Sequence, residues 1–251
     1  MKSNGIQYLN ILLATAVLMG ITGCKNDATG PDNGIPDDDA ADLIAGMMGG
    51  SSSTWGISGQ LSDVARVAAG GSMGKMDAGG GFPVVVDTVW FVRDTATVLY
   101  TYHYAGLIVF STNVPGQIQV GFAAAGSFNA PRVQSQDTSG GAWVLSNLLI
   151  AYPEYRLDGT YWRNGATASK VREKTSYSSR ASMAFSGLLI NKSTGTLAGG
   201  NCTITLTGKT GDGRSFTKSA TVTFFRGELP QLMIAGKRYY LNLALGEAQA
   251  G

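Results

Sequence analysis

Few side chains of this sequence can serve as nucleophiles, proton carriers or metal ligands. Its 251 residues include two cysteines, Cys24 and Cys202, and one histidine, His103. A single histidine excludes a metal site that needs a pair of imidazoles, and no G-x-S-x-G motif marks a nucleophilic serine. We therefore interpret His103 as a structural or surface residue, with a Ser-His-Asp arrangement as the alternative.

Acidic side chains are more numerous, but their spacing indicates neither paired catalysis nor a metal site. A glycosidase needs two carboxyl groups on facing strands or loops. The acids from residue 84 onward show no such spacing; they are Asp87, Asp94, Asp137, Glu154, Asp158, Glu173, Asp212, Glu228 and Glu247. The acidic stretch from Asp32 to Asp39 lacks the ligand spacing of an EF-hand. We expect no catalytic residue, no bound metal and no cofactor.

The most specific pattern lies at the start of the chain. Lys2 precedes an apolar run from Ile11 to Gly20, and Ile21-Thr22-Gly23-Cys24 follows directly. An apolar core of roughly 10 to 13 residues is shorter than the about 20 that span a bilayer, so residues 1–23 are predicted to be a secretion signal. The four residues that end in the cysteine resemble the lipobox of bacterial lipoproteins. An ordinary signal peptide, with a cysteine placed there by chance, is the alternative.

This resemblance implies a cellular location and a lipid anchor. In lipoproteins a peptidase cuts before the cysteine after its sulfur has received a diacylglyceryl group, so Cys24 is the expected lipidation site and new N-terminus. Two or more acyl chains hold a protein stably at a membrane, whereas one chain holds it marginally. Lys25 stands where an aspartate would favour the inner membrane. The resemblance therefore implies a lipid-anchored cell-envelope protein, at the outer membrane of a Gram-negative bacterium.

Charge is distributed unevenly along the chain. Residues 154–238 hold thirteen lysines and arginines against five acids. This basic half can meet anionic lipid headgroups or an acidic partner, or it can simply form the solvated faces of strands. A secreted, tethered chain without a basic-aromatic motif is not expected to bind nucleic acid. With Cys24 lipidated, Cys202 has no partner for a disulfide and is predicted to be a small buried hydrophobe.

Three segments follow the leader. Residues 24–37 are rich in Gly, Pro, Asn and Asp and are predicted to be a flexible tether. Residues 38–83 are predicted to contain two short helices and a glycine-rich loop that pack on a sheet, and Asp37 to Asp39 can cap the first helix. Apolar residues recur at helical spacing in both: Leu43, Ile44, Met47 and Met48, then Leu61, Val64, Ala65 and Ala68. Residues 84–251 are predicted to form a β domain.

The β domain is predicted from dense β-branched and aromatic segments joined by short connections. The expected strands are 84–92, 98–104, 106–111, 117–124, 142–151, 157–163, 168–178, 182–190, 202–208, 215–225 and 238–245. The segment 209–214 has Asp-Gly at the tip of an expected hairpin. Short connections without long helices favour an antiparallel meander that forms a curved sheet, half-barrel or sandwich.

Alternation along the strands predicts one apolar and one wet face. Cys202, Ile204 and Leu206 share one side, while Thr203 and Thr205 share the other. Strands 84–92 and 98–104 are apolar or aromatic on both faces. We expect the N-terminal helices to cover their outer side; the alternative is an apolar concavity for a lipid, lined by residues such as Trp90 and Tyr102.

One segment stands out as a ligand surface, because Tyr152 to Arg163 interleaves aromatic residues with arginines. Such a mixture suits carbohydrate stacking or lipid-headgroup contact, or a strand at the rim of a sheet. Together these patterns favour a lipid-anchored, non-enzymatic binding or carrier module for an apolar or amphipathic ligand or a partner protein. A structural envelope scaffold without a cavity and a surface-tethered hydrolase are the alternatives.

Overall fold

The computed structural model describes residues 34–49, 57, 84–86, 89–94, 99–111, 114, 116–129, 131–149, 151–171 and 175–251. The chain divides into two compact units, residues 1–32 and 33–251, and all the described residues belong to the second. For the described residues between 84 and 111, the structure gives the backbone and the strand pairing only.

One helix and one antiparallel sheet make up the described residues. The helix is α1 (Asp37–Met48), and it precedes twelve strands. The strands are β1 (Val84–Val86), β2 (Val89–Asp94), β3 (Leu99–Ser111), β4 (Ile118–Asn129), β5 (Val133–Ser146), β6 (Glu154–Ser169), β7 (Ser176–Asn191), β8 (Leu197–Thr210), β9 (Ser215–Phe224), β10 (Gln231–Ile234), β11 (Lys237–Asn242) and β12 (Glu247–Ala250).

The predicted antiparallel meander is confirmed. From β3 to β12 each strand pairs with the next along the chain, while β1 and β2 both pair with β3. Between the described strands no ladder joins β12 back to β1, so the sheet is open. The β8–β9 connection is the expected hairpin, because Asp212 and Gly213 lie in its turn and Gly213 adopts φ +87°.

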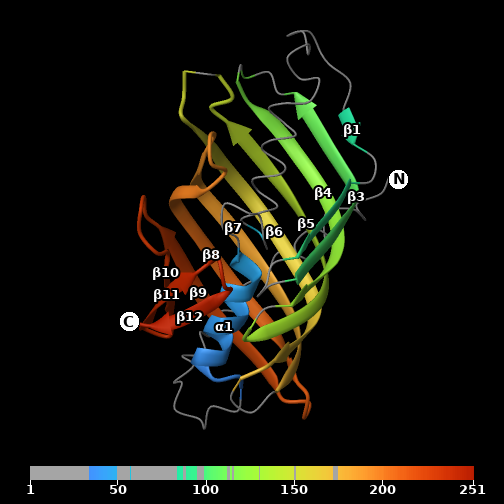
Figure 1. Ribbon diagram of the computed structural model, residues 1–251, viewed down its shortest axis with the longest axis vertical. Coiled ribbons are helices and arrows are strands. Elements are labelled where there is room, and N and C mark those ends of the chain that lie inside the picture. The colour runs from blue at the N-terminus through green and yellow to red at the C-terminus, as the bar shows by residue number, and fades with distance from the viewer. Residues whose placement is uncertain are drawn as a thin grey trace, which may run out of the picture. The chain divides into compact units, whose positions relative to one another are not determined.

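The strands curl so that one face is concave, and this inner face carries the core (Figure 1). In β8 the residues Cys202, Ile204 and Leu206 are buried while Thr203 and Thr205 are exposed, as the alternation predicted. The largest fully buried side chains of the sheet are Trp143, Tyr161, Leu145, Leu157, Leu188 and Ile190. Burying a large apolar side chain contributes about 1.5–3 kcal/mol, so the inner face supplies the driving force for the curl.

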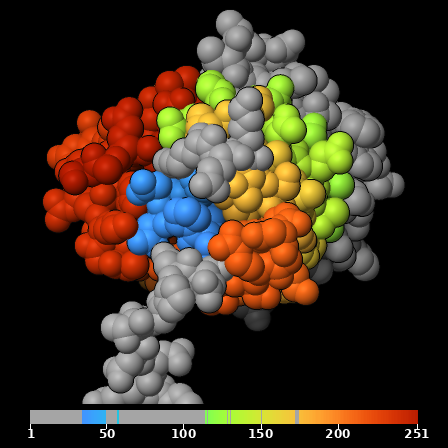
Figure 2. Space-filling model, turned by 90° about the horizontal axis from the view of Figure 1, so that it is seen from below, coloured from blue at the N-terminus to red at the C-terminus, as the bar shows by residue number. Residues whose placement is uncertain are grey.

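Helix α1 packs against this inner face near one end of the sheet. That end, the lower end in Figure 1, holds the β4–β5, β6–β7 and β8–β9 connections. Seen from below, α1 (blue) lies between the C-terminal strands in red and the strands coloured yellow and orange (Figure 2). Its apolar residues Leu43, Ile44, Met47 and Met48 are buried, as expected for a helix that is stabilised by packing.

The N-terminal region differs from the prediction of two short helices, because the structure describes one. The second expected segment, Leu61 to Ala68, lies outside the described residues. Asp37 to Asp39 form the first turn of α1; the N-cap is Pro36, which has no side-chain cap hydrogen bond. Ile35 is fully buried, so the packed domain begins inside the segment predicted as tether.

Several strand boundaries were also wrong. The expected strand 168–178 spans the turn between β6 and β7, and the expected strands 98–104 and 106–111 are one strand with a register shift between Tyr104 and Gly106. Strands β10 and β12 were not predicted. They have four residues each, which is too short for alternation to stand out.

Two glycines allow the sheet to bend between β5 and β9. A Cβ atom on Gly165 or Gly208 would approach neighbouring atoms closer than 3.0 Å, including backbone oxygens of the paired strands. Gly165 pairs with Asp137 on one side and Ser179 on the other, and Gly208 pairs with Ser179 and Phe216. Glycine inside a strand commonly marks such a tight bend. The bend crowds the inner face and spreads the outward side chains apart.

We expect Gly208→Ala to lower the free energy of unfolding by about 1–3 kcal/mol, because its Cβ would overlap the Ser178 carbonyl oxygen and the Phe216 ring. Gly121→Ala is the matched control: Gly121 also lies in a strand, and its Cβ would meet nothing within 4 Å. Urea unfolding of both variants measures the difference. If both variants lose the same free energy of unfolding, the close approach of neighbouring atoms is not the reason why position 208 requires glycine.

Candidate functional site

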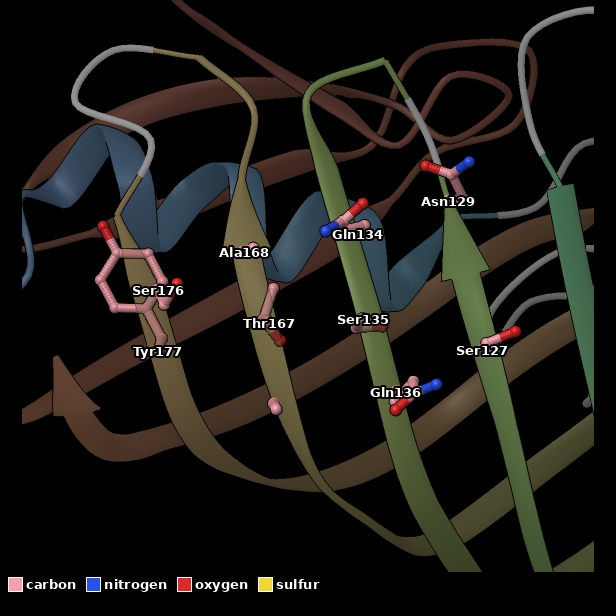
Figure 3. Close-up of a pocket in the computed structure, with 10 residues that line it drawn as sticks. Ser127, Asn129, Gln134, Ser135, Gln136, Thr167, Ala168, Ser176 and Tyr177 are labelled. Carbon is pink, nitrogen blue, oxygen red and sulfur yellow. The ribbon is translucent and has the colours of Figure 1, made fainter. Parts of the chain in front are cut away.

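The outer face of the sheet carries two open hollows that lie next to each other. The first, about 460 Å³, lies over β4 to β7. Figure 3 shows Gln134, Gln136 and Ser176 around the small side chain of Ala168, with α1 behind the strands. The second, about 560 Å³, lies over β6 to β8 and is lined by Asn164, Gly165, Ser178, Ser179, Arg180, Thr207, Gly208 and Lys209.

Strand register places the two hollows side by side. Gln136 pairs with Ala166, Ala166 with Ser178, and Ser178 with Lys209, so these four residues form one row across β5 to β8. The first two line one hollow and the last two line the other. Gly165 and Gly208, the glycines at the bend, line the second hollow. We refer to the two adjoining hollows together as the hollow.

Polar and basic side chains dominate this surface. Arg180 and Lys209 are exposed, and neither takes part in the ion pairs found between described residues. One row further along the strands, Trp162 is half-buried, and its six-membered ring lies over Gly140, where a Cβ would come within 2.8 Å of Cζ2. This combination of hydroxyl, amide and cationic groups beside an aromatic ring can bind a polar, anionic molecule.

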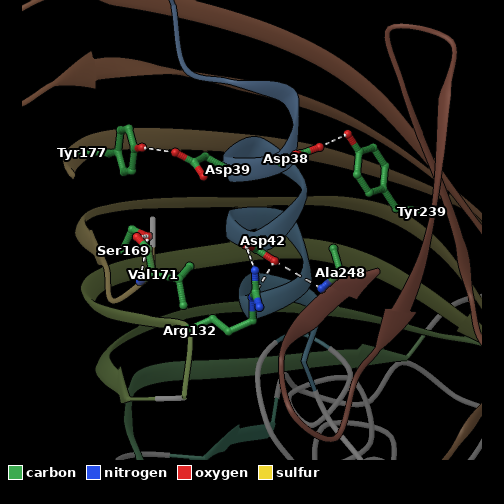
Figure 4. Close-up of polar contacts among 9 residues, drawn as sticks. All are labelled: Asp38, Asp39, Asp42, Arg132, Ser169, Val171, Tyr177, Tyr239 and Ala248. Atoms are coloured by element: carbon green, nitrogen blue, oxygen red, sulfur yellow. Dashed lines mark hydrogen bonds and ion pairs between the residues drawn. The ribbon is translucent and has the colours of Figure 1, made fainter. Parts of the chain in front are cut away.

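On the opposite face, the first turn of α1 joins three strands through its acidic side chains. Asp37 accepts hydrogen bonds from Lys218 Nζ on β9 at 2.8 Å and pairs with Lys237 Nζ on β11 at 3.1 Å. Asp38 accepts from the Tyr239 hydroxyl at 2.7 Å, and Asp39 accepts from the Tyr177 hydroxyl at 2.8 Å (Figure 4).

Asp42, one turn later, makes the most extensive contact. Arg132, just before β5, donates from Nε and Nη2 to its two carboxylate oxygens at 3.1 and 3.0 Å. The Ala248 amide of β12 also donates to Oδ1 at 3.3 Å (Figure 4). Two-point guanidinium–carboxylate contacts are among the strongest polar contacts in proteins. Asp37, Asp38, Asp39 and Asp42, the α1 aspartates, thus tie the helix to strands from β5 to β12.

The α1 aspartates do not form a metal site. Their carboxylates point to different strands, and each already binds a cation or a hydroxyl group. Within the described residues no group of three or more His, Cys, Asp or Glu side chains could hold a metal ion. Their role in this structure is to position the helix.

A buried ion pair lies beneath the helix. Arg163 Nη2 donates to Asp137 Oδ2 and to the Ser135 hydroxyl, and both charged side chains are almost fully buried. Leu43, Gly46 and Met47 of α1 enclose a cavity of about 10 Å³ beside Arg163. A cavity of that size holds at most about one water molecule. A buried charge is costly without its partner. The ion pair therefore has to stay intact while α1 packs beside it.

The residues singled out as nucleophiles fall in different places. Cys24 lies outside the described residues. His103 lies in β3, paired with Trp90 and Ala125 in the ladder. Cys202 is a fully buried free thiol, as predicted, and burial raises its pKa to about 12. A thiol with that pKa is protonated at neutral pH and is a poor nucleophile.

The segment from Tyr152 to Arg163 does not form one surface. Tyr155, Tyr161 and Arg163 are buried on the inner side, while Tyr152 and Arg156 are exposed. The reason is that β6 alternates its side chains between two faces. Trp162 is the aromatic residue of this segment that shares the outer face with the hollow.

Four acids of the β region pair with arginines rather than with each other. Asp137 pairs with Arg163, Glu154 with Arg226, Asp158 with Arg156, and Asp212 with Arg214. Each of these four acids therefore has a structural role as one partner of an ion pair.

Sequence reasoning missed the role of Asp42, and it assigned Asp37 to Asp39 to capping. One signal was present: four acids lie within six residues, 37–42, directly before the apolar stripe of α1. Carboxylates on a helix with so few polar positions must be paired when the helix is buried. Their partners are 90 to 206 residues away and cannot be read from local sequence.

Comparison of the chain with protein-family models, curated proteins and solved structures finds no match. In the described part of the chain, no helix is long and apolar enough to cross a membrane. Function is therefore inferred from the geometry of this chain.

We expect Asp42→Asn to lower the free energy of unfolding by about 2–3 kcal/mol, because Arg132 would lose its charged partner in a largely buried setting. Arg214→Gln breaks the exposed pair with Asp212 and should leave stability nearly unchanged, because water and salt screen such a pair. Chemical denaturation at neutral pH compares them. A loss for Asp42→Asn no larger than for Arg214→Gln would contradict a stabilising role for the α1 aspartates.

Asp37 should contribute a pH-dependent part of the stability. Burial by itself raises its pKa, but hydrogen bonds and charge from Lys218 and Lys237 outweigh burial and hold the pKa below the ordinary 3.8. Because the folded pKa is the lower one, this contribution is complete above pH 3.8 and is lost as the pH falls through the folded value. The stability gap between wild type and Asp37→Asn should therefore be constant near neutrality and shrink in acid. A gap that widens below pH 3.8 would show the opposite sign.

Proposed function

We propose that this protein is a lipid-anchored, non-enzymatic binding module of the bacterial cell envelope, at the outer membrane, and that it binds its ligand on the outer face of its sheet. The observation that carries the binding role is the pair of adjoining hollows over β4 to β8, the second of which is lined by the exposed Arg180 and Lys209. The anchor rests on Cys24 and the lipobox-like residues before it.

The position of α1 supports the choice of the outer face. The concave side of the sheet is occupied by packed side chains and, near the lower end, by α1 with its aspartates bound to the strands. An open sheet with a helix across its concave side favours a half-barrel over a sandwich of two sheets. An apolar carrier that uses the concavity remains the second candidate, and it requires α1 to leave its polar partners.

Chain length supports a domain held close to the membrane. Ten residues, 25–34, separate Cys24 from Ile35, the first buried residue of the domain. Fully extended, they span at most about 35 Å. The chain enters the sheet beside Lys218 and Lys237, which contact Asp37.

A scaffold and a hydrolase are the other candidates. A scaffold predicts that substitutions in the hollow leave every binding property unchanged. A hydrolase predicts turnover that depends on His103 or on two neighbouring carboxylates, and the acids at positions 137, 154, 158 and 212 pair with arginines instead.

Cys24→Ser tests the anchor. We expect the variant to move from the membrane fraction to the soluble fraction of the envelope and to lose the mass of the acyl chains, because the thiol is the acceptor of the lipid. Cys202→Ala is the matched control, since it removes the other cysteine, which is buried, and should leave fractionation unchanged. The anchor is disproved if the serine variant stays in the membrane fraction, or if intact mass shows residues 1–23 still attached.

A further inference from the structure

We propose that the hollow on the outer face binds a linear acidic oligosaccharide, with a sugar ring stacked on Trp162 and carboxylate groups at Arg180 and Lys209. This inference rests on the proposed binding role of the outer face and adds the class of ligand.

The three residues lie on one diagonal across three neighbouring strands. Asn164 pairs with Arg180, and Arg180 with Thr207; Trp162 is one row before this one, and Lys209 is one row after it. Strands are about 4.8 Å apart, and a row advances about 7 Å along a strand, so the diagonal from Trp162 to Lys209 is about 17 Å. That length suits a chain of several sugar units rather than one small anion.

The two cations are available for anionic groups. Arg180 lies between Asn164 and Thr207 in its row, and Lys209 lies beside Ser178. None of these three neighbours carries a charge that would neutralise the cations. A guanidinium binds a carboxylate at two points, and a lysine adds a point charge. The alternation of charge with hydroxyl and amide groups matches a ligand that is itself both hydroxylated and charged.

Trp162 provides the stacking surface. Gly140, its partner in the ladder, lacks the Cβ that would come within 2.8 Å of Cζ2 of the indole. The ring therefore lies close against β5, and part of its surface is open to solvent. A partly exposed indole offers an apolar surface to the C–H face of a sugar.

A lipid surface fits these residues less well. The exposed large hydrophobic residues of the described chain are Val114, Leu149, Tyr152, Phe225, Leu229 and Met233. None of them lines the hollow. A membrane-binding surface combines cations with apolar side chains that enter the acyl region, whereas the groups around Arg180 and Lys209 form hydrogen bonds.

Titration calorimetry of the full chain in detergent tests this proposal, with a galacturonic acid hexamer as the probe. We expect saturable binding that weakens about tenfold in Arg180→Ala and again in Lys209→Ala, because each removes a charge-assisted contact. Trp162→Ala should weaken binding without changing its salt dependence, since it removes stacking and no charge. Arg238→Ala is the matched control: it removes an exposed charge on β11, away from the hollow, and should leave affinity unchanged.

Further probes separate the competing ligand classes. A neutral galactose hexamer that binds as tightly as the acidic one would overturn the role of Arg180 and Lys209. Inorganic phosphate with equal affinity would show a simple anion site, and preferential binding to phosphatidylglycerol vesicles would show a lipid-surface site; either result overturns the proposal. No binding of the acidic hexamer overturns it as well. Fractionation of Cys24→Ser is independent of these results, so failure here leaves the anchor to be judged separately.

Discussion

The contacts of the α1 aspartates join strands that the hydrogen-bond ladder connects only to their neighbours. Arg132 before β5, Tyr177 on β7, Lys218 on β9 and Tyr239 on β11 all reach the same short helix. The described sheet has no ladder from its last strand to its first. The helix therefore links strands that backbone pairing leaves unconnected, and it adds to the inner-face packing that holds the sheet curved.

The two faces of the sheet differ in the kind of side chain that they carry. On the inner face, the buried charges of Asp137 and Arg163 compensate each other. On the outer face, small hydroxyl and amide side chains leave Arg180 and Lys209 open to solvent. Gly165 and Gly208 lie where the sheet bends: a Cβ on either would approach neighbouring backbone oxygens closer than 3.0 Å, and both residues line the hollow.

Sequence patterns predicted the elements that are determined by residues close together in the chain. Alternation in Cys202 to Leu206 and the turn at Asp212-Gly213 were sufficient for β8 and its hairpin. The turn between β6 and β7 was missed because the chain on both sides is rich in Ser, Thr and Ala and has no strong apolar period. The first helix was predicted from its apolar stripe, whereas its acids were given a local role and proved to have distant partners.

The hollow was beyond sequence reasoning for a different reason. Trp162, Arg180 and Lys209 are separated along the chain by 18 and 29 residues, and a one-residue change of register would send each to the other face. Their meeting depends on the exact pairing of Asn164 with Arg180 and of Ser178 with Lys209. Basic content between residues 154 and 238 indicated an anionic partner in general terms. It did not indicate where the charges would gather.

The route by which the chain enters the domain has a mechanical consequence. Tension on the segment before Pro36 acts first on the opening turn of α1, where Asp37 meets Lys218 and Lys237. Such a pull is shared at once among β7, β9 and β11 through three adjacent side chains. Load spread in parallel over several attachment points resists rupture better than the same points broken one after another. Three adjacent aspartates in one helical turn thus attach the N-terminal end of the domain to three strands at once.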